Sequence, residues 1–168
     1  ALAAVAAAIF GAPLRAKAWV ALAVVAAASA WAGSTAIGVL ADGAPRILWQ
    51  ADGFLLGGGG GSMDTLSALF VLLISLGSVA SVLYSHGYLA HSLAEKSPAH
   101  VSLHYTALTV MALSMLGVAT SDGGYTFLFF WELMTIASFL LILYDAERRE
   151  TVRAALAYLI MMHIGFVL

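Results

Sequence analysis

Residues 125 to 144 read Tyr125-Thr-Phe-Leu-Phe-Phe-Trp-Glu-Leu-Met-Thr-Ile-Ala-Ser-Phe-Leu-Leu-Ile-Leu-Tyr144, an apolar run of 20 residues with one charged residue, Glu132. A helix of this length extends about 30 Å, which matches the hydrocarbon thickness of a bilayer. The run therefore predicts a transmembrane helix that carries Glu132 into the membrane interior. Because an acidic side chain costs about 3 kcal/mol near the centre of an inserted helix, a carboxylate there favours a role in ion or proton movement.

The composition of the whole chain also predicts a membrane protein. Hydrophobic residues make up 62% of the 168 residues and charged residues 10%, and the mean hydropathy is +0.99, whereas soluble domains contain about 25% charged residues. The seven Lys and Arg residues form no basic stripe, so we expect no nucleic-acid partner. The lack of cysteine excludes thiolate metal sites, and we expect neither a metal nor another cofactor in this chain.

Charged residues divide the chain into uncharged stretches long enough to cross a membrane. The stretches hold 24, 30 and 25 residues and lie between Lys17 and Asp42, Asp64 and Glu95, and Lys96 and Asp122. We predict an all-α, polytopic membrane helix bundle of about six transmembrane helices, near residues 1–12, 19–40, 65–85, 101–120, 125–144 and 152–168. The two end helices are expected to be incomplete, with residues 1–124 forming an N-terminal helical part and residues 125–168 the start of a second part.

The basic residues predict the direction in which the helices cross the membrane. If the helices alternate in direction, six of the seven Lys and Arg residues fall on one side, and Arg46 falls on the other. The positive-inside rule then makes the loops near 13–18, 86–100 and 145–151 cytoplasmic and the start of the chain external. We therefore expect a multi-pass protein of the cell (inner) membrane, surrounded by the lipid bilayer.

One segment, near residues 41–62, does not resemble a membrane span. The stretch from Arg46 to Leu56 has short apolar patches around Gly53 and predicts a small external β-hairpin. The five glycines from Gly57 to Gly61, followed by Ser62, are interpreted as a natural flexible tip, with an engineered linker as the alternative.

Several polar residues inside or beside the predicted helices have more than one interpretation. The serines at three- and four-residue spacing predict a helix-packing seam, with a hydrated ion path as the alternative; they are Ser75, Ser78, Ser81 and Ser85. Four histidines flank one predicted loop and are expected to be solvated there, with proton collection as the alternative; they are His86, His91, His100 and His104. Every Lys and Arg is assigned to a loop.

His163 differs from the other histidines because it lies in the last apolar run. It is 11 residues from Val152, and Glu132 is 12 residues from Tyr144, so the two side chains are predicted at similar depth. Successive helices joined by a short loop pack as antiparallel neighbours. We therefore predict Glu132 as the proton-translocating residue and His163 as a candidate relay. The alternative for each is a hydrogen bond to a backbone carbonyl or to a hydroxyl such as that of Thr135.

Three segments carry a family resemblance. They are Phe127-Leu-Phe-Phe-Trp-Glu-Leu-Met-Thr-Ile-Ala-Ser-Phe-Leu-Leu141, Arg153-Ala-Ala-Leu-Ala-Tyr-Leu-Ile-Met-Met-His-Ile-Gly165 and Met63-Asp-Thr-Leu-Ser-Ala-Leu-Phe70. They resemble the N-terminal part of the antiporter-like proton-translocating subunits of respiratory complex I, Mrp-type cation/proton antiporters and membrane-bound hydrogenases. The Met-His-Ile-Gly ending is most similar to the large membrane subunit of formate hydrogenlyase-type hydrogenases.

The resemblance implies a proton- or sodium-translocating membrane subunit of a redox-driven complex, namely a membrane-bound hydrogenase or a complex I-like enzyme. Its implied partners are other membrane subunits and a peripheral redox arm. It also implies that Glu132 interacts with a lysine on a later helix, which this sequence does not contain, so the chain is not expected to be catalytic alone. An Mrp-type antiporter subunit without redox partners is the alternative, and a structural membrane anchor is the third function considered.

Overall fold

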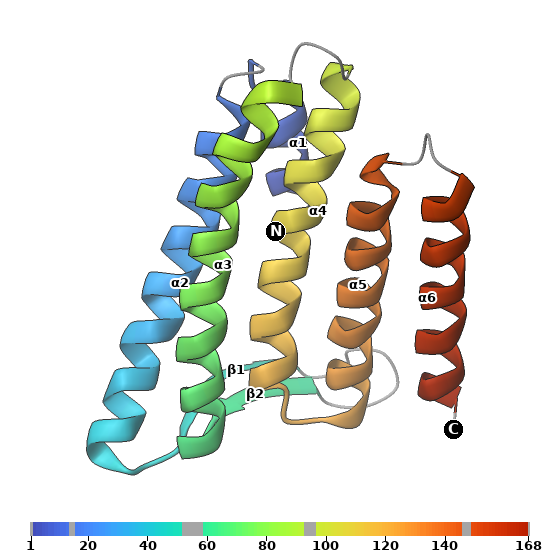
Figure 1. Ribbon diagram of the computed structural model, residues 1–168. Coiled ribbons are helices and arrows are strands. Elements are labelled where there is room, and N and C mark those ends of the chain that lie inside the picture. Colours follow the sequence, from blue (N-terminus) through green and yellow to red (C-terminus); the bar gives the residue numbers. More distant parts are fainter. Residues whose placement is uncertain (1, 14–15, 52–58, 93–96, 146–148, 168) are drawn as a thin grey trace.

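The computed structural model describes residues 2–13, 16–51, 59–92, 97–145 and 149–167, which form a helix bundle with one small sheet (Figure 1). The helices are α1 (Leu2–Gly11), α2 (Lys17–Asp42), α3 (Thr65–Ser92), α4 (Pro98–Thr120), α5 (Gly124–Ile142) and α6 (Arg149–Val167), with a short 3-10 helix, η1 (Leu143–Asp145), after α5. The strands β1 (Arg46–Ala51) and β2 (Gly59–Met63) pair antiparallel. The all-α class and the small hairpin are therefore confirmed.

Four helices in the described part of the chain are long and apolar enough to cross a membrane, namely α2, α3, α4 and α5. Large apolar side chains cover their outer faces; Trp19 is 60% exposed, and Leu76 is 73% exposed. Such extensive apolar surface is typical of contact with lipid or with other membrane helices. The chain is a multi-pass membrane protein. Crossing by α1, which has 10 residues, and by α6 stays a prediction.

Local capping explains why the helices start or end away from the predicted positions. Pro98 begins α4 three residues before the predicted start, and the Ser97 hydroxyl accepts a hydrogen bond from the His100 backbone N–H, as an N-cap should. Gly43 ends α2 in the left-handed conformation, with φ of 69°, and its N–H donates to the Val39 carbonyl at 2.8 Å.

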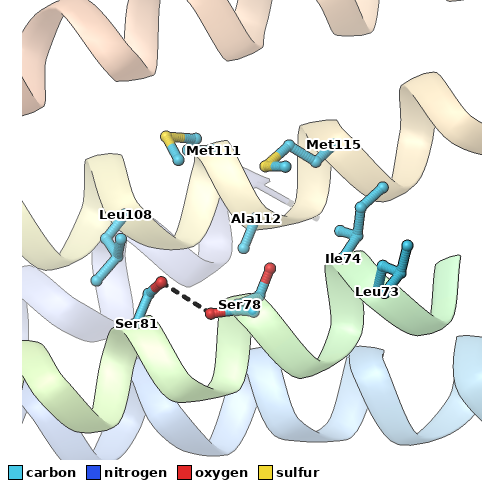
Figure 2. Close-up of a pocket in the computed structure, with 9 residues that line it drawn as sticks. Leu73, Ile74, Ser78, Ser81, Leu108, Met111, Ala112 and Met115 are labelled. Atoms are coloured by element: carbon cyan, nitrogen blue, oxygen red, sulfur yellow. Dashed lines mark hydrogen bonds between the residues drawn. The ribbon is translucent and has the colours of Figure 1, made fainter. Parts of the chain in front are cut away.

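The helices α2, α3 and α4 pack against one another, α5 packs along α4, and α6 contacts α5 at the edge of the bundle (Figure 1). Gly117 of α4 allows α5 to approach closely, because a Cβ atom there would lie 2.5 Å from the Phe130 ring. Between α3 and α4 lies a pocket of about 340 Å³, with Ser78 and Ser81 on one wall and Met111 and Met115 on the other (Figure 2).

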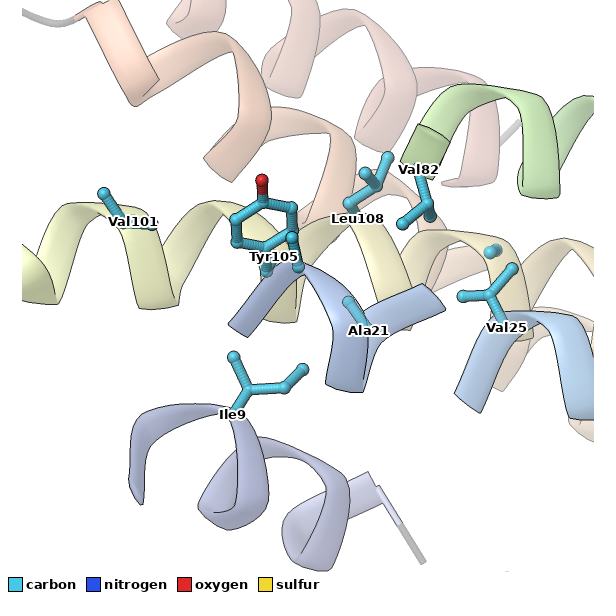
Figure 3. Close-up of a cluster of buried hydrophobic side chains, with 9 residues drawn as sticks. Ile9, Ala21, Val25, Val82, Val101, Tyr105 and Leu108 are labelled. Carbon is cyan, nitrogen blue, oxygen red and sulfur yellow. The ribbon is translucent and has the colours of Figure 1, made fainter. Parts of the chain in front are cut away.

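Two clusters of buried apolar side chains hold the bundle together. The first joins α1, α2, α3 and α4 through small and branched residues, including Ile9, Ala21, Val25, Val82 and Leu108 (Figure 3). The second lies toward the hairpin and joins α2 and α3 to Met63 of β2. Alanines on the buried faces let the helix backbones approach closely, which is how membrane helices gain packing energy without a hydrophobic effect between them.

The hairpin differs from its predicted form, because its second strand is made of the glycine run itself. Gly59 to Gly61 were expected to be part of a flexible tip, but they pair with β1 in β2, and residues 52–58 lie outside the described part. The Trp49 ring covers Gly61 so closely that a Cβ atom there would lie 2.3 Å from the indole nitrogen. Glycine at this position therefore has a structural role, which supports its interpretation as natural sequence.

The alternation of the helices separates most described basic residues from Arg46. Lys17 begins α2, and Arg149 and Arg153 lie in the first turns of α6, at one end of the bundle. Arg46 lies at the opposite, hairpin end, where its guanidinium contacts Asp42 at 2.6 Å. We call the first end the basic end. The prediction that every Lys and Arg lies in a loop is wrong, because these three basic residues are helical.

Candidate functional site

Glu132 lies in the middle of α5, on a helix whose position is set by packing against α4. Thr135, one turn further along, is buried, and its hydroxyl donates to the Glu132 backbone carbonyl at 2.8 Å. Thr135 was considered as an alternative partner for the Glu132 side chain. In the structure it bonds to the backbone of Glu132, while the carboxylate has another partner.

That partner is His163 of α6. The imidazole Nε2 lies 2.8 Å from Glu132 Oε1, and Nδ1 lies 2.8 Å from the backbone carbonyl oxygen of Leu159, one turn earlier in α6. The predicted similar depth of the two residues is therefore accompanied by direct contact between their side chains. The contact to Leu159 also fixes the orientation of the ring, so the imidazole is held by its own helix while its other nitrogen faces α5.

The two contacts determine how many protons the pair holds. A carbonyl oxygen can only accept, so Nδ1 carries a hydrogen and donates it to Leu159. One further proton must then lie between Nε2 and Oε1, giving either a charged imidazolium–carboxylate pair or a neutral imidazole with a protonated carboxyl group. Both arrangements have zero net charge. Removing this proton would leave two lone pairs facing each other, and adding one would leave a net positive charge.

The surroundings of the pair favour the arrangements with zero net charge. The side chains of Glu132 and His163 are 36% and 45% exposed, and their neighbours on α6 are apolar, with Ile160 57% exposed and Ile164 55% exposed. In a membrane this face meets lipid or another protein helix, where an uncompensated charge is costly. The pair can therefore exchange a proton internally without a change in net charge, whereas each net gain or loss of a proton is opposed.

Comparison with known proteins agrees with the membrane architecture. The chain is similar to Na(+)/H(+) antiporter subunit A1 of Staphylococcus aureus. In strains JH9, Newman and JH1 the identity is 39% over 104 residues. The match covers 61% of this chain but 12% of each relative, so the chain corresponds to a small part of their length. No protein-family model matches the chain.

The similarity to antiporter subunit A1 supports the coarser part of the predicted resemblance, which is to antiporter-like membrane subunits. These relatives are named for Na(+)/H(+) antiport, and their names mention no hydrogenase or redox complex. The closer resemblance to hydrogenase subunits therefore stays a prediction.

The sequence did not reveal the contacts of His104. The predicted helix 101–120 contains this residue, but its side chain was expected to be solvated beside the loop. In the structure it lies in α4 between α3 and η1, and its Nε2 is 2.8 Å from the Ser85 hydroxyl. Its ring also packs at 4.9 Å from the ring of Tyr144. The Ser97-Pro98 start signal of α4 could have placed it deeper, because a helix that begins there has His104 at the end of its second turn and not in its first.

The other three histidines of this group have different environments. His86 is an exposed helical residue whose ring lies 5.5 Å from that of Trp19, and His100 is exposed in the first turn of α4. The side chain of His91 lies outside the described part. The exposure of His86 and His100 therefore agrees with the expected solvation, although both residues are helical, while the partly buried His104 does not agree with it.

Lys17 is a buried basic residue that the sequence analysis assigned to a loop. It is 4% exposed in the first turn of α2, where its amine contacts the Ser102 hydroxyl of α4 and lies 3.4 Å from the Phe10 carbonyl. These contacts join α1, α2 and α4 at the basic end. The long aliphatic stem of lysine allows this, because it can lie against apolar neighbours while the amine reaches polar atoms.

The predicted serine seam is present along most of its length. Ser75, Ser78 and Ser85 are buried on the packed side of α3, as expected for helix packing. Ser81 instead is exposed, and its hydroxyl donates to the Gly77 carbonyl at 2.8 Å beside the pocket of Figure 2.

Proposed function

We propose that the chain is part of a proton- or sodium-translocating membrane subunit, in which Glu132 and His163 carry protons across the middle of the bilayer. The observation that carries this proposal is the 2.8 Å contact between Nε2 and Oε1 inside an otherwise apolar helix pair. A hydrogen bond between membrane helices that served packing alone would need no titratable groups, because serine, threonine or asparagine could supply it. Two titratable groups at this depth favour proton handling instead.

The proposed step uses the shared proton. When one member of the pair takes up a proton from one side, the other member gives up a proton to the next carrier. The shared proton moves between Oε1 and Nε2, so the pair again holds one proton. Because the Leu159 carbonyl holds the ring in place, the imidazole stays oriented toward Glu132 throughout. A basic group on a further helix, as the resemblance implies, would stabilise the ionised carboxylate and so favour release of the proton from Glu132.

The similarity to antiporter subunit A1 supports an assembly with other membrane subunits, and we propose the cell (inner) membrane as its location. The antiporter names of the relatives favour a cation/proton antiporter, while the residues around His163 favour a redox-driven complex with a peripheral redox arm. Purification of the full-length protein with its partners separates the two. Co-purifying redox subunits would support the second assembly, and membrane subunits without redox cofactors would support the first.

The proposed role of the pair is tested in the full-length protein, reconstituted with its partners in vesicles. Glu132→Gln keeps the shape and the hydrogen-bonding capacity of the side chain but removes its titration, so we expect assembly to persist and proton movement to fall about 100-fold or more. Glu150→Gln, at the exposed start of α6, is the matched control and should leave transport unchanged. Normal transport in assembled Glu132→Gln would contradict the proposal.

A further inference from the structure

A second titratable site lies at the basic end of the bundle, separate from the Glu132–His163 pair. His104 reaches across from α4 to α3, where its Nε2 lies 2.8 Å from the Ser85 hydroxyl, and its ring packs 4.9 Å from the Tyr144 ring of η1. The neighbouring Tyr105 is 2% exposed, and its ring lies 5.5 Å from the imidazole. Three helical segments thus converge on one imidazole.

The second ring nitrogen of His104 is the unusual feature of this site. Nδ1 is buried and has no hydrogen-bond partner among the described residues. Buried polar atoms are nearly always hydrogen-bonded, and one without a protein partner commonly binds water. An imidazole with one nitrogen on a hydroxyl and the other buried without a protein partner gains the two connections that a proton relay needs when a water molecule binds the second nitrogen.

The pocket between α3 and α4 lies one helical turn deeper than His104. Leu108, four residues after His104, lines this pocket from α4, and Ser81, four residues before Ser85, lines it from α3 (Figure 2). Residues four apart lie on the same helix face. His104 and Ser85 therefore lie one turn closer to the basic end than the residues that line the pocket. Its volume of about 340 Å³ has room for several water molecules beside the Ser78 and Ser81 hydroxyls.

We propose that His104 is a proton-relay residue that connects the basic end of the bundle with the pocket between α3 and α4. This inference rests on the proposed translocation function and adds a proton-carrying residue to it. The resting form of His104 is the neutral imidazole. The described groups that face it from α3, α4 and η1 are Ser85, Tyr105 and Tyr144, and none of them is charged near neutral pH.

In the proposed transfer, the imidazole gains one proton at Nδ1 and loses one at Nε2. In the tautomer with hydrogen on Nε2, Nδ1 takes a proton from water at the basic end and the Nε2–H bond breaks as Ser85 Oγ accepts that proton. The Ser85 hydroxyl releases its own proton to water in the pocket, so the serine is unchanged. The imidazole is left with hydrogen on Nδ1 and returns to its first form by rotation of the ring or by transfer in the reverse direction.

The test uses the full-length protein in its complex and measures proton movement in vesicles. His104→Gln can still bond to Ser85 but cannot relay a proton, so we expect the rate of proton movement to fall about tenfold or more. His100→Gln, at the exposed start of the same helix, is the matched control and should stay within about twofold of the wild type. Glu132→Gln is measured beside them.

Deuterium exchange at the imidazole C2 position, followed by mass spectrometry of the wild type, gives a readout independent of transport and of any folding defect. We expect His104 to exchange more slowly than His100, with a sigmoidal dependence on pH. We also expect Ser85→Ala to move the midpoint of that curve, because it removes the hydroxyl that contacts Nε2.

The outcomes separate this inference from the proposed function. Loss of transport in Glu132→Gln with normal transport in His104→Gln would overturn the role of His104 and leave the proposed function in place. Normal transport in both assembled variants would overturn both. Absence of exchange at His104 while His100 exchanges fully would also overturn the role of His104 as a proton relay, because solvent protons must reach a relay residue.

Discussion

The imidazole of His163 is held between two helices, with Nδ1 on the Leu159 carbonyl of its own helix and Nε2 on the Glu132 carboxylate of α5, each at 2.8 Å. Since the carbonyl accepts only, the contact with Glu132 contains one proton. The pair is therefore a one-proton unit with zero net charge. This property distinguishes it from a surface ion pair, whose two groups titrate almost independently in water.

The one-proton unit predicts non-additive effects of substitution. Glu132→Gln and His163→Gln should each lower proton movement about 100-fold, and the double variant should be little slower than either single one, because both changes remove the same transfer step. The transport rates of the wild type, the two single variants and the double variant, measured in vesicles, form the double-mutant cycle that tests this. Fully multiplied effects in the double variant would mean that the two residues act in separate steps.

The close approach of α4 and α5 predicts a strong effect of a single methyl group. Gly117→Ala should destabilise the protein by about 1 to 3 kcal/mol, because its Cβ atom would lie 2.5 Å from the Phe130 ring and force the helices apart. Gly77→Ala is the matched control in α3, where nothing lies within 4 Å of an added Cβ atom. This control should be neutral or slightly stabilising, since alanine is the better helix former.

Thermal unfolding of the purified full-length protein, followed by intrinsic fluorescence, checks this difference. A melting temperature of Gly117→Ala equal to that of Gly77→Ala would show that α5 can move away from α4 without loss of stability.

Asp64 predicts an acid-dependent weakening of the start of α3. Its carboxylate accepts a hydrogen bond from the Ser67 backbone N–H at 2.7 Å, and this bond, with a weaker contribution from the Ser67 side chain, lowers the pKa of Asp64 below its usual 3.8. The stabilisation is therefore fully present above about pH 3.8 and is lost as the pH falls through the lowered pKa.

Asp64→Asn isolates this charge, because asparagine caps helices about as well as aspartate. We expect the wild type to melt at a higher temperature than Asp64→Asn near neutral pH, and the difference to close as the pH falls below about 3.8. A difference that widened toward acid pH would contradict the assigned cause.

The separation of basic residues predicts the membrane orientation. Cysteines placed at exposed Ser97, at the basic end, and at exposed Asp122, at the hairpin end, should react with impermeant reagents from opposite sides. We expect Ser97→Cys to react from the cytoplasm, because the end that is richer in Lys and Arg normally stays there. Reaction of both cysteines from the same side would contradict the alternating arrangement of α4 and its neighbours.

The sequence by itself determined the membrane class, the helices around Glu132 and the similar depth of Glu132 and His163. These features follow from the length and spacing of apolar runs, and from the costs of placing charges and unpaired backbone groups in a bilayer. Depth follows from the rise of the helix alone, so counting residues from Tyr144 and Val152 was enough to predict it.

The tertiary structure decided which side chains meet. Depth along a helix does not specify rotation about its axis, so packing of α6 on α5 was needed to bring His163 Nε2 to Glu132 Oε1. The same holds for His104, whose contact with Ser85 joins residues 19 positions apart. The glycine run likewise becomes a strand by pairing with β1, with Gly61 against the Trp49 ring, and these contacts could not be predicted from a local preference for flexibility.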